Sequence, residues 1–403
     1  MIIPMIIASD KTQLTHFHDK QAYPVYLTIR NIPKDIHRKP SRHAQLLIAY
    51  LPTTKLGGIS NKSAQRRVLA NLFHVCMGHV LELIASHGET GVPMMSGDGV
   101  WWRCHPIFAV FVGDYPEQTL VTCTYNGRCP KCSVSPDNLS KSQSFPLHPQ
   151  TNAIETYCLA DDDNVHMFHL ACCQEGLKPI YHPFWQKLPF SNIFNSITPD
   201  ILHQLLQGMV RHIIKWLIKI YGSAAIDSHC KAMPLNHKIM LFTKGIATLS
   251  QVLGQEHKRM CAILLGLIID LPLPSALNSS HLIKAVHTLL DFLYLAQFIS
   301  HTSETICQLQ DSLTMFHNNK GIFVDLRVRD HFNIPKLHSL THYESSIQLF
   351  GTTDNYNMEQ SERLHIDMVK DAYRAMNHKD EYPQMTNWLE RQEKVECHAA
   401  FVN

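Results

Sequence analysis

The sequence predicts an α/β fold, a mixed sheet interrupted by a large α-helical insertion. Three observations lead to this prediction. Within the first fifty residues, three short apolar runs are each bounded by turn or breaker residues, as strands are. A fourth apolar run follows a long amphipathic stretch. From residue 183 to residue 332, apolar residues then recur at helical spacing.

The first three predicted strands are residues 5–10, 23–29 and 43–51. Their connections are short, so an antiparallel meander is the expected arrangement. Residues 61–87 are predicted to form a helix that starts at an N-cap asparagine and stops at a glycine. Residues 100–113 form the fourth predicted strand, and its unbroken apolar centre indicates burial on both faces.

The first and fourth predicted strands both end on an aspartate, Asp10 and Asp114. A rigid sheet can hold such carboxylates in fixed positions. An RNase H-like nuclease core begins in the same way, with three strands, a helix and a fourth strand, and with acids at the ends of the first and fourth strands. This is an analogy of fold until a third acid is found. Asp98 competes for the second position, but its Gly-Asp-Gly setting is more typical of a turn.

The remaining chain completes the predicted organisation. Residues 1–120 form the first part of the core, and 121–182 form a cysteine- and histidine-rich loop region. Residues 183–332 form the helical insertion, with helices expected at 200–221, 237–253, 256–269, 281–300 and 304–318. Residues 333–403 return to the core and include a last helix at 355–376.

Composition narrows the class of protein. A length of 403 residues fits two or three domains, or one core with a large insertion. The net charge of +2 neither requires nor excludes nucleic acid. Twelve cysteines in so long a chain do not suggest a disulfide framework, so a reducing, intracellular setting is expected. The longest apolar run, 260–269, is too short to span a membrane, and no membrane partner is expected.

Seven stretches resemble the Plavaka family of fungal DNA transposases, relatives of the CACTA cut-and-paste transposases. One of them is the Gly-Asp-Tyr-Pro-Glu-Gln run at 113–118; the others are residues 9–15, 23–32, 128–132, 183–185, 198–205 and 351–357. The resemblance covers about residues 5–395. It implies a nuclear DDE transposase: an RNase H-like catalytic domain with an Asp, Asp, Glu triad, split by a helical insertion before the glutamate.

The chain also departs from this family. Family members usually have more sequence before the first strand, often a zinc-finger-like DNA-binding region, so we expect this chain to be truncated at its N-terminus. Met358 stands where a smaller polar residue is expected. One alternative is an inactive or domesticated copy that binds DNA or protein. Another is a plain RNase H-like nuclease, against which the large insertion argues.

The expected chemistry is cleavage and strand transfer at phosphodiesters. Two Mg²⁺ or Mn²⁺ ions held by carboxylates serve such reactions. Asp10 and Asp114 are the first two expected ligands, and the third comes from the last helix. Glu362 is preferred because it continues a stripe through Ile366, Val369 and Tyr373; Glu359, on the same helix face, is the alternative.

A second metal site is expected for one structural Zn²⁺. Cys129 and Cys132 have the spacing of half a zinc knuckle. The other two ligands are expected from a downstream group made up of His166, His169, Cys172 and Cys173. From this group we select His169 and Cys173. Reduced structural cysteines explain the pair nearly as well.

Two further sets of residues are candidates. Asp200 and His203 match a short Asp/Cys-x2-His signature of related transposases and are expected near the site, although Asp200 also suits a helix start. Four basic residues are expected to contact the phosphates of double-stranded DNA, at transposon ends and at target sites. They are Arg38, Lys39, Arg66 and Arg67. An ordinary solvated face would explain these residues equally well. We expect a homo-oligomer when the protein is active.

Overall fold

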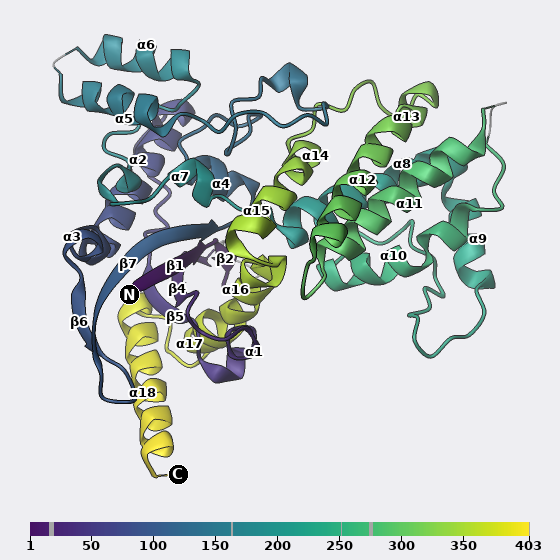
Figure 1. Cartoon of the computed structure of the whole chain (residues 1–403). Coiled ribbons are helices and arrows are strands. Elements are labelled where there is room, and N and C mark those ends of the chain that lie inside the picture. Colours follow the sequence, from purple (N-terminus) through teal and green to yellow (C-terminus); the bar gives the residue numbers. More distant parts are fainter. Residues whose placement is uncertain (16–19, 163, 251, 274–276, 403) are drawn as a thin grey trace. The chain divides into compact units, whose positions relative to one another are not determined.

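A computed structural model describes residues 1–15, 20–162, 164–250, 252–273 and 277–402. Within these ranges, the chain divides into two compact units (Figure 1). The first contains residues 1–125, 149–197 and 355–403, and the second contains 126–148 and 198–354. The boundaries expected from sequence were residues 120, 182 and 332.

The first unit is built on a mixed five-stranded sheet in the order β5-β4-β1-β7-β6. Strand β1 pairs antiparallel with β4, and β4 pairs antiparallel with β5. Strand β1 pairs parallel with β7, whose other neighbour β6 is antiparallel. The bounds are β1 Ile2–Ser9, β4 Pro24–Ile29, β5 Leu46–Tyr50, β6 Val92–Met95 and β7 Trp101–Val112. The predicted meander and the α/β class are therefore confirmed.

Successive side chains of β1 point to opposite faces of the sheet, and its C-terminal half is buried on both. Ile7 and its partner Phe111 are fully buried in a core that also contains Phe73 of α2 (Lys62–Val80). Ala8 and its partner Val112 point to the opposite face because side chains alternate along a strand. Burying a side chain such as Ile7 stabilises the fold by about 1.5–3 kcal/mol.

Helix α2 begins where the sequence predicts. The side chain of Asn61 accepts hydrogen bonds from the backbone N–H groups of Ser63 and Ala64, at 2.9 and 3.1 Å. The single predicted helix is interrupted at Leu81, after which α3 (Glu82–Thr90) continues at an angle of 46°. This bent pair has the length and composition of a broken membrane span, whereas no single helix in the described ranges does.

The remaining elements of the first unit are short, apart from the last helix. They are β2 Thr12–Gln13, β3 Gln21–Ala22, α1 Lys34–His37, α4 Tyr115–Val121, α5 Gln150–Cys158, α6 Val165–Glu175, α7 Ile193–Ser196, α16 Met358–Leu364, η8 His365–Lys370, α17 Asp371–Arg374 and α18 Glu381–Val402. Ile197, just after α7, forms an isolated parallel bridge with Phe111 of β7.

The second unit is helical. Its elements are η5 Ile201–Val210, α8 Arg211–Tyr221, α9 Ser223–Ala232, α10 Gly254–Ile268, α11 Ser279–Ala296, α12 Ser303–Asn319, α13 Ile322–Asp325, α14 Pro335–His338, η6 Ser339–His342 and α15 Tyr343–Phe350. Segment η5 is π-helical and runs directly into α8. Its apolar side chains join those of α10 and α11 in one core.

One predicted helix of this unit is wrong. Residues 237–250 form turns, and Gly245 has a φ of +86° that ends any helix there. The backbone N–H groups of Ile246 and Ala247 donate to Asp227 Oδ1 at 2.8 and 3.0 Å. This side-chain acceptor replaces the carbonyl partners that a helix would supply.

Candidate functional site

Asp10 and Asp114 leave the same edge of the sheet on neighbouring strands. Ala8 pairs with Val112 across the parallel strands β1 and β7, and each aspartate lies two residues beyond this pair, just past the end of its strand. Both aspartates are half-buried. Sheet pairing therefore brings together two residues that are about a hundred positions apart in sequence.

Glu117 lies close to both aspartates. Asp114 caps α4, and its Oδ1 accepts a hydrogen bond from the Glu117 backbone N–H at 2.9 Å. Burial and the charges of Asp10 and Asp114 together raise the pKa of the Glu117 carboxyl to about 8, against the lowering effects of Tyr23 and Lys11. Two acids acting on one carboxyl indicate a concentrated negative charge at this sheet edge. Glu117 was not among the residues predicted from sequence, although it lies within the Gly113–Gln118 run.

Helix α16 lies on the same face of the sheet as Ala8 and Val112. Asn357, Gln360 and Ser361 line a small cavity together with Ala8 and Val112. Gln360 Oε1 also accepts a hydrogen bond from Gln45 Nε2 at 2.9 Å. The helix that carries both candidate glutamates is thus placed against the strands that carry the aspartates.

The two glutamates of α16 have different surroundings. Glu359 Oε2 accepts a hydrogen bond at 3.1 Å from the side chain of Asn357, the N-cap of its own helix. Glu362 lies near His365, whose pKa is lowered to about 4 by burial while the Glu362 charge raises it. The centres of the His365 and Tyr26 rings lie 5.6 Å apart, and Tyr26 belongs to β4. The charge of Asp10 in turn contributes to raising the pKa of Tyr26. These contacts relate Glu362 to the aspartate side of the sheet.

The apolar stripe used to choose Glu362 is partly wrong. Val369 and Tyr373 are buried, but Ile366 is 40% exposed. Segment η8 is π-helical, and its wider turn shifts the buried face, so that Leu364 and His365 are buried instead.

Asp98 belongs to the turn between β6 and β7. It is exposed, accepts a hydrogen bond from the Ser96 hydroxyl, and accepts another from the Val100 N–H at 3.2 Å. The Ser96 hydrogen bond lowers the pKa of its carboxyl. These contacts give Asp98 a local role in the hairpin.

Asp200 and His203 form a local pair at the start of η5. Asp200 is almost fully buried, and its Oδ2 accepts hydrogen bonds from the backbone N–H of His203 at 2.6 Å and from the His203 ring Nδ1 at 3.1 Å. Asp200 is therefore the N-cap of η5.

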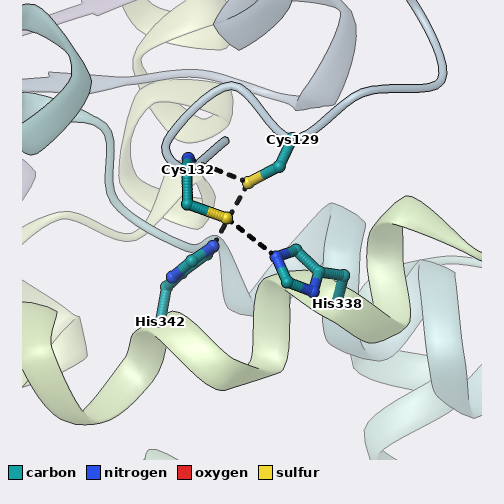
Figure 2. A group of neighbouring side chains, drawn as sticks. All are labelled: Cys129, Cys132, His338 and His342. Atoms are coloured by element: carbon teal, nitrogen blue, oxygen red, sulfur yellow. Dashed lines mark hydrogen bonds between the residues drawn. The ribbon is translucent and has the colours of Figure 1, made fainter. Parts of the chain in front are cut away.

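A second cluster brings two cysteines together with two histidines (Figure 2). The Cys129 Sγ lies 3.2 Å from His342 Nε2, and the Cys132 Sγ lies 3.1 Å from His338 Nε2. The four potential ligand atoms are all within 4.8 Å of one another. Cys129, Cys132 and His338 are buried, and His342 is half-buried.

Local structure prepares this cluster for a metal. The backbone N–H groups of Lys131 and Cys132 donate to the Cys129 sulfur at 3.4 Å. Burial opposes ionisation of Cys129, but the Cys132 hydrogen bond and the His342 charge lower the pKa of its thiol well below the usual value. His338 and His342 end consecutive helical turns, four residues apart on one face. Two sulfur and two imidazole ligands suit Zn²⁺, so the cluster could bind zinc.

The expected partners of the cysteine pair are corrected by this cluster. His169 and Cys173 lie on α6 in the first unit, whereas Cys129 and Cys132 belong to the second. His338 and His342 already complete a set of four. The sequence signal was the His-x3-His spacing, which lies some two hundred residues beyond the cysteines.

The basic candidates are all exposed. Arg38 and Lys39 follow α1 and line a small cavity with Gln360 and Leu364 of α16. Arg66 and Arg67 lie on the first turns of α2. Exposure is compatible with phosphate contacts and with an ordinary solvated face.

Together, the fold and these residues define a mixed α/β protein with paired acids at one sheet edge and a Cys₂His₂ cluster that could hold a metal. Residues 1–217 match the sequence profile of the family described as Plavaka transposase. The chain therefore belongs to the Plavaka transposase family, as its sequence resemblance predicted. A search of curated proteins found no match.

Proposed function

We propose that this chain is the catalytic part of a DDE-type transposase that cleaves and joins transposon-end DNA. The observation that carries the proposal is the pairing of β1 with β7, which sets Asp10 and Asp114 at adjacent strand ends. The sheet order and the parallel bridge from Phe111 to Ile197 are compatible with an RNase H-like core. In sequence, the helical residues 198–354 are inserted before α16 of the same core, which also supports the proposal.

Asp10, Asp114 and Glu362 are the proposed ligands of two Mg²⁺ or Mn²⁺ ions. The donor set fits, because hard divalent ions take carboxylate oxygens. When bound, such ions activate the attacking oxygen and stabilise the leaving oxygen of a phosphodiester. Glu362 is preferred over Glu359 because it lies near His365, whose ring packs beside Tyr26, a residue on which the Asp10 charge acts.

The protein residues have their own roles in this proposal. The sheet fixes Asp10 and Asp114, while the Glu117 N–H holds the Asp114 carboxylate in one orientation. The raised pKa of Glu117 keeps its carboxyl mainly protonated at neutral pH, which limits repulsion beside the two aspartates.

Zinc has a separate, structural role in the proposal. Cys129, Cys132, His338 and His342 leave no open ligand position in a tetrahedral Zn²⁺ site, which is typical of structural zinc. The ion would fasten the loop at residues 126–148 to the α14–η6 turn of the same unit.

Cleavage of labelled double-stranded DNA tests the proposal. The purified chain should nick DNA weakly and with little sequence preference in Mg²⁺ or Mn²⁺. Asp10→Ala and Glu362→Ala should abolish nicking, and Asp98→Ala should retain it because Asp98 is exposed and hydrogen-bonded within the hairpin turn. Absence of metal-dependent nicking from a folded chain would instead favour a copy that binds DNA without cutting it. We further propose that the protein acts on this DNA in the nucleus and as a homo-oligomer.

A further inference from the structure

Helix α8 carries a row of cations on its exposed side. Arg211, Lys215 and Lys219 are spaced four residues apart, so they share one face of the helix. All three are exposed. The opposite side of α8 is buried in the core of the second unit through Ile213, Ile214, Trp216 and Leu217.

Two more cations, from a segment more than a hundred residues later, lie beside this row. The Arg329 guanidinium lies 5.5 Å from the centre of the Trp216 ring. The stem of Lys336 packs on Gly208, just before α8, where an added Cβ would lie 2.8 Å from its Cδ. Lys219 Nζ donates to the backbone carbonyls of Arg327 and Val328 at 3.3 and 3.2 Å, which holds the two segments together. We call Arg211, Lys215, Lys219, Arg329 and Lys336 the basic surface.

His212 reports the electrostatic environment of the basic surface. Its ring stacks on the Trp216 ring, with the two ring centres 5.8 Å apart. The pKa of His212 is lowered to about 4, first by burial and then by four nearby charges, all of them positive. These charges belong to Arg329, Lys336, Lys215 and Arg211. Residues 201–221 contain no Asp or Glu, and the segment at 325–336 contributes two exposed acids, Asp325 and Asp330. The basic surface therefore has an excess of positive charge that an anion would relieve.

We propose that the basic surface binds the phosphate backbone of double-stranded DNA. The row on α8 extends about 12 Å along the helix axis, while duplex DNA presents one charge per about 1.7 Å. Planar guanidinium groups such as that of Arg329 suit phosphate oxygens. Contacts of this kind position DNA without reading its sequence. The inference rests on the proposed function only for the nature of the partner, and it adds a contact in the helical unit to the candidates Arg38, Lys39, Arg66 and Arg67.

Fluorescence anisotropy with a labelled duplex tests this proposal without cleavage. The full chain is titrated at several salt concentrations in a buffer without added divalent ions. The double variant Arg211→Gln, Lys215→Gln should bind about 10- to 60-fold more weakly near 0.1 M salt, and the slope of log K against log salt should become shallower by about 2. The matched control Lys258→Gln, Lys284→Gln removes the same charge from exposed positions on α10 and α11 of the same unit.

The control variant should bind within about threefold of the wild type, since neither lysine is among the charges that act on His212. Equal losses in both double variants would overturn the proposal, because binding would then depend on total charge alone. The exchange variant Arg211→Lys, Lys215→Arg keeps both charges, so it should bind DNA with wild-type affinity even if the glutamine variant is less stable. Loss of DNA binding by a folded exchange variant would also overturn the proposal.

Two further measurements distinguish duplex binding from RNA binding and from DNA cleavage. An unlabelled single-stranded RNA that displaced the duplex better than unlabelled duplex would make the surface an RNA site and overturn the proposal. Cleavage by the wild type is measured separately with added Mg²⁺ or Mn²⁺, because the binding buffer contains no added divalent ion. A failure of cleavage therefore leaves the binding result unaffected.

Discussion

Asp114 is expected to have two separable roles, as helix cap and as metal ligand. Its Oδ1 accepts the Glu117 N–H at 2.9 Å at the start of α4. Asparagine caps a helix as well as aspartate does, but it lacks the negative charge that a divalent ion requires. We therefore expect Asp114→Asn to keep the stability of the first unit and to lose DNA cleavage. Asp114→Ala should lose both.

The magnitude follows from the single capping interaction. Replacing an N-cap aspartate by alanine costs about 1 kcal/mol, within a range of about 0.5–2 kcal/mol. For a unit of roughly two hundred residues this lowers the midpoint of thermal unfolding by about 2–4 °C. Asparagine keeps the hydrogen bond from the Glu117 N–H, so Asp114→Asn should have the stability of the wild type.

Thermal unfolding and DNA nicking, measured on the same preparations, provide the assay. We expect an asparagine variant that is stable and inactive beside an alanine variant that is less stable and inactive. Wild-type nicking by Asp114→Asn would refute the metal-ligand role. Equal stability of the alanine variant and the wild type would refute the capping role.

Three other predictions concern zinc, pH and η5. Purified protein should contain about one zinc per chain by metal analysis; Cys132→Ser and His342→Ala should lose it, and Cys173→Ser should keep it, whereas the reverse pattern would contradict the cluster. Burial lowers the pKa of His74 to about 4, so the unfolded state binds more protons between pH 6.5 and 4. The free energy of unfolding should fall as pH decreases through this window, on the order of 3 kcal/mol from this residue, and more gently in His74→Gln; identical pH profiles would refute this. Asp200→Ala should lower the unfolding midpoint by removing a cap worth about 1 kcal/mol, while Asp200→Asn should not; a midpoint that is unchanged in Asp200→Ala would contradict the capping role.

The strands near the N-terminus could be predicted because local signals and tertiary packing agree. The apolar runs before Asp10 and Asp114 are continuous, and the structure buries the ends of both strands on both faces of the sheet. The edge strand β6 was missed because its four residues include Pro93 and three others that are mostly exposed. Such a strand depends on pairing with β7 rather than on its own pattern.

The metal cluster shows a different limit. Cys129 and Cys132 could be selected because they are close in sequence, but His338 and His342 reach them only through the folding of the helical unit. A nearby group of cysteines and histidines on α6 therefore seemed the better choice. The stripe through Ile366 failed for a local reason, because a regular helical period does not anticipate the π-helical turn of η8.

The most direct test of the central claim is to locate manganese in crystals of the chain grown with MnCl₂, from its anomalous scattering. We expect anomalous peaks at the edge of the sheet, with carboxylate oxygens of Asp10, Asp114 and Glu362 within bonding distance. Peaks bonded to Glu359 in place of Glu362 would contradict the choice of glutamate. Manganese bound elsewhere, with no peak beside Asp10 and Asp114, would contradict the proposal that these paired aspartates form the catalytic metal site.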